Sequence, residues 1–258
     1  MILRPLEPTP RSRGDFLSAW DVVMRSQKQR YESCWVITQP SHAALSGEIA
    51  ARLSGPQVPR LEPELVRAIA LHDAGWGMPD AQAVMRSRAG GGACPKSFLE
   101  AGGGEFVTAW TQSILTAQST LPAGGYMVSR HFWRIGKHRL ETAADSAADR
   151  GKLQAFLDSE AQRQKKLAAK QQRSFEELEK LADVLQFCDL LSLYICCGAQ
   201  ENVELPEYFG VRVKLRVEAE GYKLDPALVE AGSQFKVAAL RHPATKEKSG
   251  EELTVRFS

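Results

Sequence analysis

The chain has 258 residues, of which 43% are hydrophobic and 25% charged, so it is long and apolar enough to bury a hydrophobic core and is not expected to be disordered. Its 33 Lys and Arg residues against 31 Asp and Glu residues give a formal net charge of +2, which excludes a strong overall attraction to double-stranded nucleic acid. No run of about 20 apolar residues and no apolar signal segment is visible, and the five cysteines form no CxxC pair, so we expect a cytoplasmic protein without a membrane partner.

Two short β-favouring stretches stand near the N-terminus, at residues 1–6 and 31–39. We expect these two stretches to pair in an antiparallel manner. The polar region between them contains residues 15–26, which fit either a helix or a loop.

Two short helices are predicted next. Pro40 suits a first helical turn, and apolar residues then recur at helical spacing over 41–53 until Gly55 and Pro56 end the pattern. The second helix is predicted over residues 62–75, because it begins beside a proline and ends at a glycine. These two helices are expected to pack on each other.

A glycine-rich segment follows, from Trp76 to Gly104, and we expect an irregular loop that crosses the surface. Helical patterning then resumes in four stretches, the third of which is rich in Lys and is expected to be exposed. Ser174 and Glu177 form a capping-box signature ahead of the last stretch, which is the most apolar helix of the chain and is predicted to be central. The four predicted stretches are 105–118, 126–140, 149–173 and 178–197.

The pattern changes near the C-terminus. Residues 211–217 alternate apolar and basic side chains, which is typical of a half-buried strand, and residues 235–243 and 252–258 resemble two more strands. The sequence therefore predicts a mainly α protein with a small antiparallel sheet from the C-terminal strands, with the N-terminal strands as optional additions. The predicted divisions are an N-terminal β or irregular segment (1–38), a helical domain (39–200) and a C-terminal β-rich appendage (201–258).

Polar side chains fall on apolar helix faces in the first two predicted helices. His72 follows Leu65 and Ile69 on one stripe, and Asp73 lies on the adjoining stripe, so both are expected to face the core. His42 lines up with apolar residues of its own helix in the same way, and we expect it to be buried too.

Asp189 lies within the most apolar helix, and no Lys or Arg occurs between Lys180 and Arg212. An unpaired buried carboxylate is strongly unfavourable, so a cation from elsewhere is needed; the alternative is a core hydrogen-bond cluster. Histidines together with carboxylates suit a divalent transition metal (Zn, Mn, Fe, Ni or Co) better than the all-oxygen ligation of Ca or Mg. With open positions, such an ion lowers the pKa of a bound water, and hydrolysis is the natural chemistry.

The order of these residues resembles the HD-domain superfamily of metal-dependent phosphohydrolases: a His on one helix, a His-Asp doublet ending another, and a later Asp inside an apolar helix. The segments ITQPSHAALSG, AIALHDAGW and VSRH, followed by an apolar-flanked Asp, are similar to an uncharacterised bacterial family of HD-like proteins of unknown function. The resemblance covers about residues 36 to 200 and implies an HD-like helical bundle. It also implies that His42, His72, Asp73 and Asp189 are metal ligands and that the substrate is a phosphoester or a nucleotide.

A phosphoryl substrate needs positive charge, and Arg130 and Arg134 stand close to His131 on one predicted helix. We expect the metal-activated water to be the nucleophile, Asp73 to position or partly deprotonate it, and one of the two arginines to stabilise the developing charge. His131 is interpreted as a further ligand, a general acid or a buried structural histidine. The arginines have a second interpretation, which is pairing with acidic residues of the charged helix at 149–173.

Two other functions stay open. Ala74, Gly75 and Trp76 follow the doublet, where the superfamily usually has a polar or basic residue that assists catalysis, and this favours a non-catalytic metal-containing ligand sensor or interaction module. A di-iron oxygenase-type HD protein is the third option. Asp80 and Lys96 in the predicted loop are weaker candidates for the rim of the pocket. The expected partner is a small phosphorylated molecule or a nucleotide, and a homodimer is left open.

Overall fold

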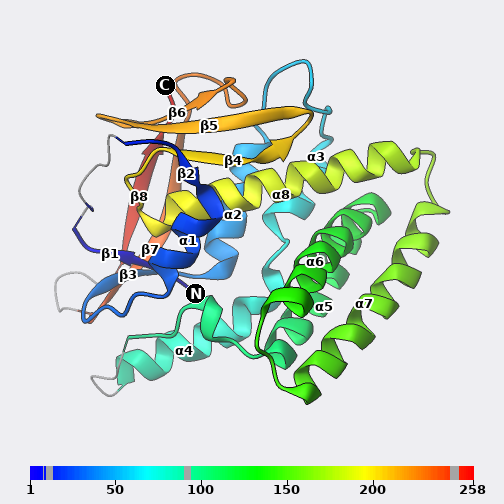
Figure 1. Cartoon of the computed structure of the whole chain (residues 1–258), viewed down its shortest axis with the longest axis horizontal. Helices are drawn as coiled ribbons and strands as arrows, with labels where there is room; N and C mark the ends of the chain where they lie inside the picture. Colours follow the sequence, from blue (N-terminus) through cyan, green and yellow to red (C-terminus); the bar gives the residue numbers. More distant parts are fainter. Residues whose placement is uncertain (8, 10–13, 90–93, 245–249) are drawn as a thin grey trace.

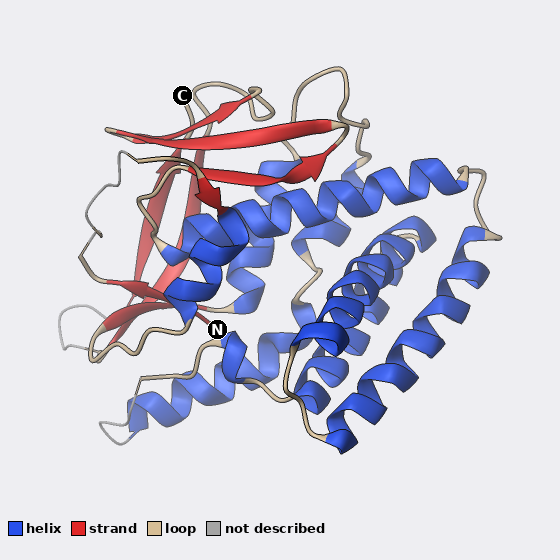
Figure 2. Cartoon of the chain, in the orientation of Figure 1, coloured by secondary structure: helices blue, strands red, loops and turns tan. Residues whose placement is uncertain are grey.

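The structure is a computed structural model that describes residues 1–7, 9, 14–89, 94–244 and 250–258. The two sheets lie around the C-terminal half of the long helix α8, and helices α5 to α7 lie on the side of its N-terminal half (Figure 1). Figure 2 shows the strands gathered in one half of the molecule and most of the helical residues in the other.

The strands are β1 (Ile2–Pro5), β2 (Leu17–Ser18), β3 (Cys34–Ile37), β4 (Val203–Tyr208), β5 (Val211–Glu218), β6 (Gly221–Asp225), β7 (Gln234–His242) and β8 (Gly250–Arg256). The α-helices are α1 (Ala19–Gln27), α2 (Gln39–Ala50), α3 (Pro63–Ala70), α4 (Gly77–Ala89), α5 (Gly103–Gln118), α6 (Pro122–Thr142), α7 (Ala147–Ala168) and α8 (Phe175–Cys197). Two short 3-10 helices are η1 (Ala74–Trp76) and η2 (Phe98–Glu100).

The first sheet unites strands from the two ends of the chain. Its order is β1-β3-β7-β8 with antiparallel pairing throughout, and Cys34 of β3 lies between Pro5 of β1 and His242 of β7. The second sheet has the order β2-β4-β5-β6, in which only β2 and β4 are parallel. A bridge between Tyr222 and Phe257 connects the two sheets.

The prediction of a mainly α protein, an HD-like bundle with one small sheet, was wrong. The structure is about 53% helix and 20% strand, and its described strands form two four-stranded sheets, which is a mixed α/β architecture. The predicted C-terminal strands are present as β5, β7 and β8, and the predicted N-terminal pairing is present as β1 with β3. Strands β2, β4 and β6 were missed because they are short, and because Pro206 interrupts the pattern of β4.

Helix α8 is the structural centre of the molecule, as its apolar sequence predicts. Its N-terminus carries the predicted capping box: the Ser174 side chain accepts from the Glu177 backbone N–H, and the Glu177 carboxylate accepts from the Ser174 backbone N–H. Every residue over 187–197 is buried. The helix packs against α2, α6 and α1 as well as against β1 and β4, so its polar residues are held inside the protein.

Two predicted boundaries differ from the structure near the candidate site. The segment 76–104, expected to be one irregular loop, contains helix α4, because Pro79 is tolerated in the first helical turn, residues 81–89 are mostly good helix formers and the glycine runs lie beyond them. The second predicted helix ends early, at Ala70, and His72 and Asp73 follow in a turn that leads into η1. Both side chains are nevertheless buried, because this turn packs beneath α2 and α5.

One large hydrophobic cluster takes side chains from the N-terminal, helical and C-terminal parts of the chain, including Ile2, Ile49, Leu185 and Phe235. The sequence-based division at residues 38 and 200 stays a prediction. No helix within the described residues combines the length and the apolar composition that crossing a bilayer requires.

Candidate metal centre

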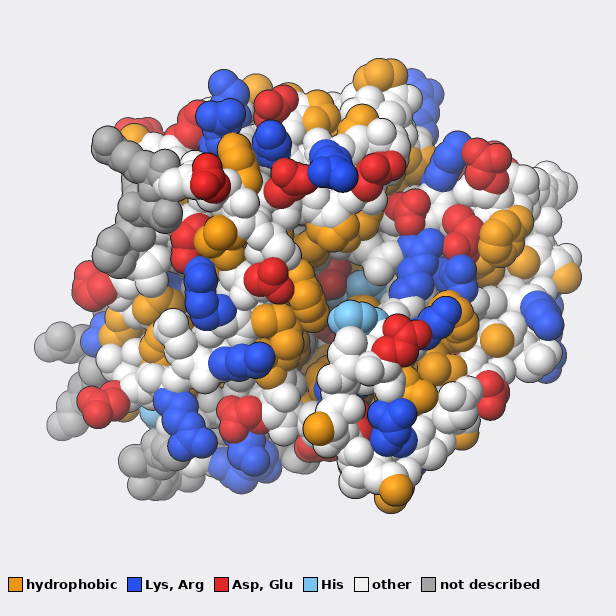
Figure 3. Space-filling model, viewed as in Figure 1, with side chains coloured by type: hydrophobic (Ala, Val, Ile, Leu, Met, Phe, Trp, Pro, Cys, Tyr) orange, Lys and Arg blue, Asp and Glu red, His pale blue; other side chains and the backbone are white. Residues whose placement is uncertain are grey.

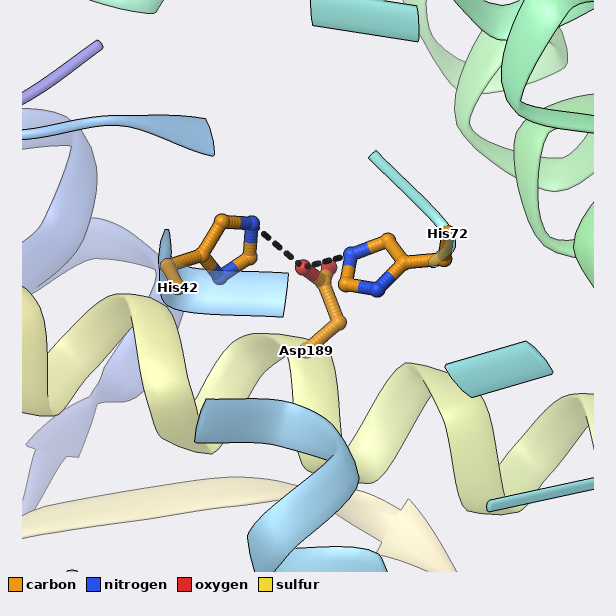
Figure 4. A group of neighbouring side chains, drawn as sticks. All are labelled: His42, His72 and Asp189. Atoms are coloured by element: carbon orange, nitrogen blue, oxygen red, sulfur yellow. Dashed lines mark hydrogen bonds and ion pairs between the residues drawn. The ribbon is translucent and has the colours of Figure 1, made fainter. Parts of the chain in front are cut away.

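Four polar side chains from three separate parts of the fold meet in the interior. His42 lies in the first turn of α2, which follows β3 directly in the chain. His72 and Asp73 lie in the turn after α3. Asp189 lies in the buried half of α8. Figure 4 shows His42 and His72 pointing toward the Asp189 carboxylate from opposite sides.

Three of these side chains form a group that could hold one metal ion, because ligand atoms of His42, His72 and Asp189 all lie within 4.8 Å of one another. His42 Nε2 lies 2.9 Å from Asp73 Oδ2 and 3.6 Å from Asp189 Oδ1. His72 Nε2 lies 3.7 Å from Asp73 Oδ2 and 3.2 Å from Asp189 Oδ1. Metal–ligand bonds of about 2.1 Å place neighbouring ligand atoms ~3.0 Å apart at right angles and ~3.4 Å apart at tetrahedral angles. The separations of His42 and His72 from Asp189 Oδ1, 3.6 and 3.2 Å, lie close to these values.

Both histidines are oriented through their other ring nitrogen. His72 Nδ1 donates to the backbone oxygen of Ile69 at 2.8 Å, and since a carbonyl only accepts, the Nδ1 atom carries the hydrogen. His42 Nδ1 lies 2.8 Å from Ser192 Oγ, whose own hydroxyl donates to the Asp189 backbone oxygen at 2.9 Å and so leaves the Ser192 oxygen free to accept. Each Nε2 atom is therefore available as a ligand.

The two carboxylates require positive charge at this point. Burial alone would lower the pKa of His72, but the charges of Asp73 and Asp189 raise it to about 9. Burial alone would raise the pKa of Asp189, but its hydrogen bond with His72 and the charge of His131 lower it to about 2. Without a metal, a proton on His72 Nε2 occupies the place that a cation would take.

The centre is almost completely buried. His42 and His72 have no exposed surface, whereas Asp73 and Asp189 are 5% and 8% exposed, so solvent reaches the centre on the carboxylate side. Figure 3 shows a hollow in the middle of one face, with acidic and histidine side chains visible inside it and Lys or Arg side chains along one margin.

His131 of α6 borders the same centre. Its Nε2 atom lies 3.7 Å from Asp189 Oδ2, and its ring stands edge-on to the ring of His72 at a centroid distance of 5.6 Å. Burial lowers the pKa of His131 to about 4, so this histidine is neutral at neutral pH. Its Nδ1 atom is buried without a hydrogen-bond partner.

Arg130 and Arg134 are paired with carboxylates rather than left free. Arg130 Nε and Nη2 lie 3.0 and 2.9 Å from Glu179 Oε2. Arg134 donates to the same Glu179 oxygen at 2.9 Å, to Asp183 Oδ1 at 2.7 Å and to the Gln186 side chain. The sequence suggested pairing with the charged helix α7 as the alternative to substrate binding, but the partners stand on α8, one to three turns before Asp189.

The sequence analysis missed two hydroxyl groups behind the ligands. Ser192 contacts the His42 ring, and Ser46 Oγ lies 2.7 Å from Ser192 Oγ. A signal was available: Ser192 follows Asp189 by three residues and Ser46 follows His42 by four, so each shares a helix face with a candidate ligand.

Asp80 and Lys96 line a cavity of about 580 Å³ whose walls include none of the four ligands. Asp80 is itself buried and accepts from the Gln39 backbone N–H at 2.7 Å, which caps the first turn of α2. We assign Asp80 a role in holding the helix that carries His42.

Comparison with known proteins gives one match. Residues 24–229 match the family described as "Protein of unknown function (DUF3891)", a range that contains all four candidate ligands, His131 and both arginines. The match leaves out β1, β2 and the first half of α1, as well as the paired strands β7 and β8. No protein with a curated description and no solved structure matched the chain.

Proposed function

Since the chain belongs to the DUF3891 family, whose description assigns no activity, we propose its function from the site itself: a metal-dependent hydrolase that acts on a phosphoester or a nucleotide. In this proposal His42, His72, Asp73 and Asp189 hold a divalent transition metal ion. The order of these residues along the chain resembles that of HD-domain phosphohydrolases, and the proposal extends the resemblance to the reaction.

One observation carries the proposal. Two imidazoles whose Nδ1 atoms are already hydrogen-bonded converge, through Nε2, on two buried carboxylates. A metal ion would replace the proton that His72 Nε2 carries in the metal-free protein, and it would balance the charge of the two buried carboxylates. Mixed nitrogen and oxygen donors at these distances favour Zn, Mn, Fe, Ni or Co over Ca or Mg.

The chemistry follows from what the side chains around the ion can do. A bound ion of this class lowers the pKa of a coordinated water and polarises a phosphoryl oxygen. In this proposal Asp73 would orient the attacking water molecule and accept a proton from it. His131, neutral and beside Asp189, can hold or exchange a proton at Nε2 on the opposite side. Arg130 and Arg134 contribute if a substrate phosphate replaces the carboxylates of Glu179 and Asp183.

A non-catalytic ligand sensor is the second candidate, and one observation favours it. The three residues after the doublet form η1, in which the Trp76 ring is buried edge-on against Phe106 at a centroid distance of 5.3 Å. The Gly75 backbone N–H there is taken by Ser113 at 2.9 Å. This turn therefore offers no polar side chain next to Asp73 to assist a reaction.

Metal content is the first test of the proposal. The purified protein, dialysed and analysed for elements, is expected to retain about one transition-metal ion per chain. Asp189→Asn and His72→Ala should lose the ion, whereas Glu160→Gln should keep it, because Glu160 is an equally buried carboxylate bound to Ser129 and Arg163 away from the centre. Retention of metal by Asp189→Asn, or absence of metal from the wild type, would refute the site.

Turnover then separates the two candidate functions. The metal-loaded protein is tested on aryl phosphate mono- and diesters, cyclic dinucleotides and nucleoside triphosphates, with His72→Ala as the inactive control. Hydrolysis that requires both metal and His72 supports the enzyme. A rise in Tm with a nucleotide but no product supports the sensor instead. A visible absorption band from bound iron would redirect the search toward oxygenase chemistry.

A further inference from the structure

Two cysteines distant in sequence meet at the sheet, away from the metal centre. Cys34 is the first residue of β3 and is fully buried between β1 and β7. Cys94 lies between α4 and η2 and is partly exposed. Their sulfur atoms lie 3.0 Å apart, which is only about 1 Å longer than the bond of a disulfide. The two sulfur atoms need to approach by only about 1 Å to form a bond.

The two thiols differ in access to reagents. Cys94 lies on the wall of the cavity of about 580 Å³ that also includes Lys96 and Arg86. Cys34 has no exposed surface. A small oxidant therefore reaches Cys94 first, and Cys34 stands behind it as the only described thiol within bonding reach.

The hydrogen bond between the two thiols also favours oxidation of Cys94 before Cys34. The hydrogen bond from Cys34 lowers the pKa of Cys94, and the same bond raises the pKa of Cys34. The other three cysteines lie inside α8, where burial raises the pKa of each thiol; for Cys197 it rises to about 12. They lack the access and the partner that Cys94 has.

We propose that Cys34 and Cys94 form a redox pair that closes to a disulfide when a hydroperoxide oxidises Cys94. The Cys94 thiolate attacks the terminal oxygen of hydrogen peroxide, breaks the O–O bond and gives a sulfenic acid and, after protonation, water. The Cys34 sulfur then attacks Cys94 Sγ, the S–O bond breaks, and the thiol proton leaves with the hydroxide as a second water. Two thiols are oxidised by two electrons and one peroxide is reduced to two waters.

The disulfide would enclose the part of the chain that carries most of the metal centre. The loop from residue 34 to residue 94 contains His42, His72 and Asp73, so the cross-link would tie β3, the element before α2, to the chain beyond α4. Loop closure of this size restricts the unfolded chain and is expected to raise Tm by roughly 5–10 °C. The proposal itself depends on the thiol geometry alone and stands whether or not a metal binds.

Thiol counting with peptide mapping tests the pair. The full-length protein is treated with hydrogen peroxide or with a reductant, denatured, and alkylated with N-ethylmaleimide for mass analysis. The reduced protein is expected to take five labels and the oxidised protein three, with a cross-linked peptide that joins Cys34 to Cys94. Peroxide should raise the Tm of the wild type, and a reductant should reverse this rise.

Single-cysteine variants show whether the cross-link and the Tm rise depend on this pair of thiols. Cys94→Ser and Cys34→Ser should each abolish the cross-link and the Tm rise, whereas Cys196→Ala, which removes a buried thiol of α8, should retain both. Five labels after peroxide treatment, a cross-link between other cysteines, or accumulation of Cys94 sulfinic acid without a cross-link would overturn the proposal.

Discussion

Replacing Ser192 by alanine probes the metal centre without touching a ligand. In the wild type, Ser192 Oγ accepts from His42 Nδ1 at 2.8 Å and thereby leaves Nε2 unprotonated for the ion. Asp73 Oδ2, 2.9 Å from Nε2, would accept a hydrogen from that atom equally well. Without Ser192, the ring hydrogen is expected to move to Nε2 and bond to Asp73, and metal binding must then reverse this change.

The expected size of the effect follows from the lost contact. Removing the partner that orients a ligating histidine typically weakens metal binding 10- to 100-fold, or about 1.4–2.8 kcal/mol. The apo protein should also lose about 1–2 kcal/mol of stability, because a buried hydrogen bond is lost. Ser46, which contacts Ser192 but not the His42 ring, should show a smaller loss of affinity when replaced by alanine.

Metal affinity is measured by competition with a chromogenic chelator at fixed pH. Ser129→Ala is the matched control, because Ser129 is equally buried and its hydroxyl donates to Glu160 at 2.8 Å, far from the ligands. The control should lose stability but keep its metal affinity. Equal affinities for the Ser192→Ala and wild-type proteins, or an equal loss in the Ser129→Ala control, would refute the orientation argument.

Three further predictions use other contacts. Gly47→Ala should destabilise the protein by about 1–3 kcal/mol in urea titrations, because the added Cβ would lie 2.5 Å from Ala70 Cβ, whereas Gly151→Ala, with open space around it, should gain up to ~1 kcal/mol. With the pKa of His72 at about 9, that histidine is protonated at neutral pH in the metal-free protein, so metal affinity should rise with pH up to about 9 and then level off; calorimetry in two buffers should detect about one released proton at pH 7. Arg134→Ala should cost about 1 kcal/mol of stability, and a large drop in kcat/KM with unchanged stability would instead identify a substrate contact.

Several elements were predictable because their signals are local. The capping box at Ser174 and the apolar run behind it specify α8 within one stretch of chain, and the alternation over 211–217 specifies β5. Asp189 stood out for the same reason, since a carboxylate in such a helix needs a cation from elsewhere. The burial of His72 was predicted correctly but for the wrong reason. Helix α3 ends at Ala70, so His72 is buried by the packing of the turn after the helix and not by its position on an apolar helix face.

The errors concern features that depend on distant pairing. The sheet became larger than expected because β3 from the N-terminal region hydrogen-bonds to β7 near the C-terminus, and no local pattern encodes which strand is the neighbour. Helix α4 was hidden by the glycines that follow it. The acidic partners of Arg130 and Arg134 were expected on α7 but lie on α8. The sequence indicates that each arginine needs an acidic partner, but it does not indicate which helix supplies that partner.

The sequence by itself determined that Asp189 had to find a counter-charge, because it lies in an apolar helix without a nearby Lys or Arg, and it indicated His42, His72 and Asp73 as candidates to share a site with it. Only the tertiary structure decided that the four converge within hydrogen-bonding distances, that Ser192 stands behind His42, and that Cys34 and Cys94 touch. The physical reason is that burial is encoded by local periodicity, whereas the contact between two buried groups depends on how separate helices and strands pack.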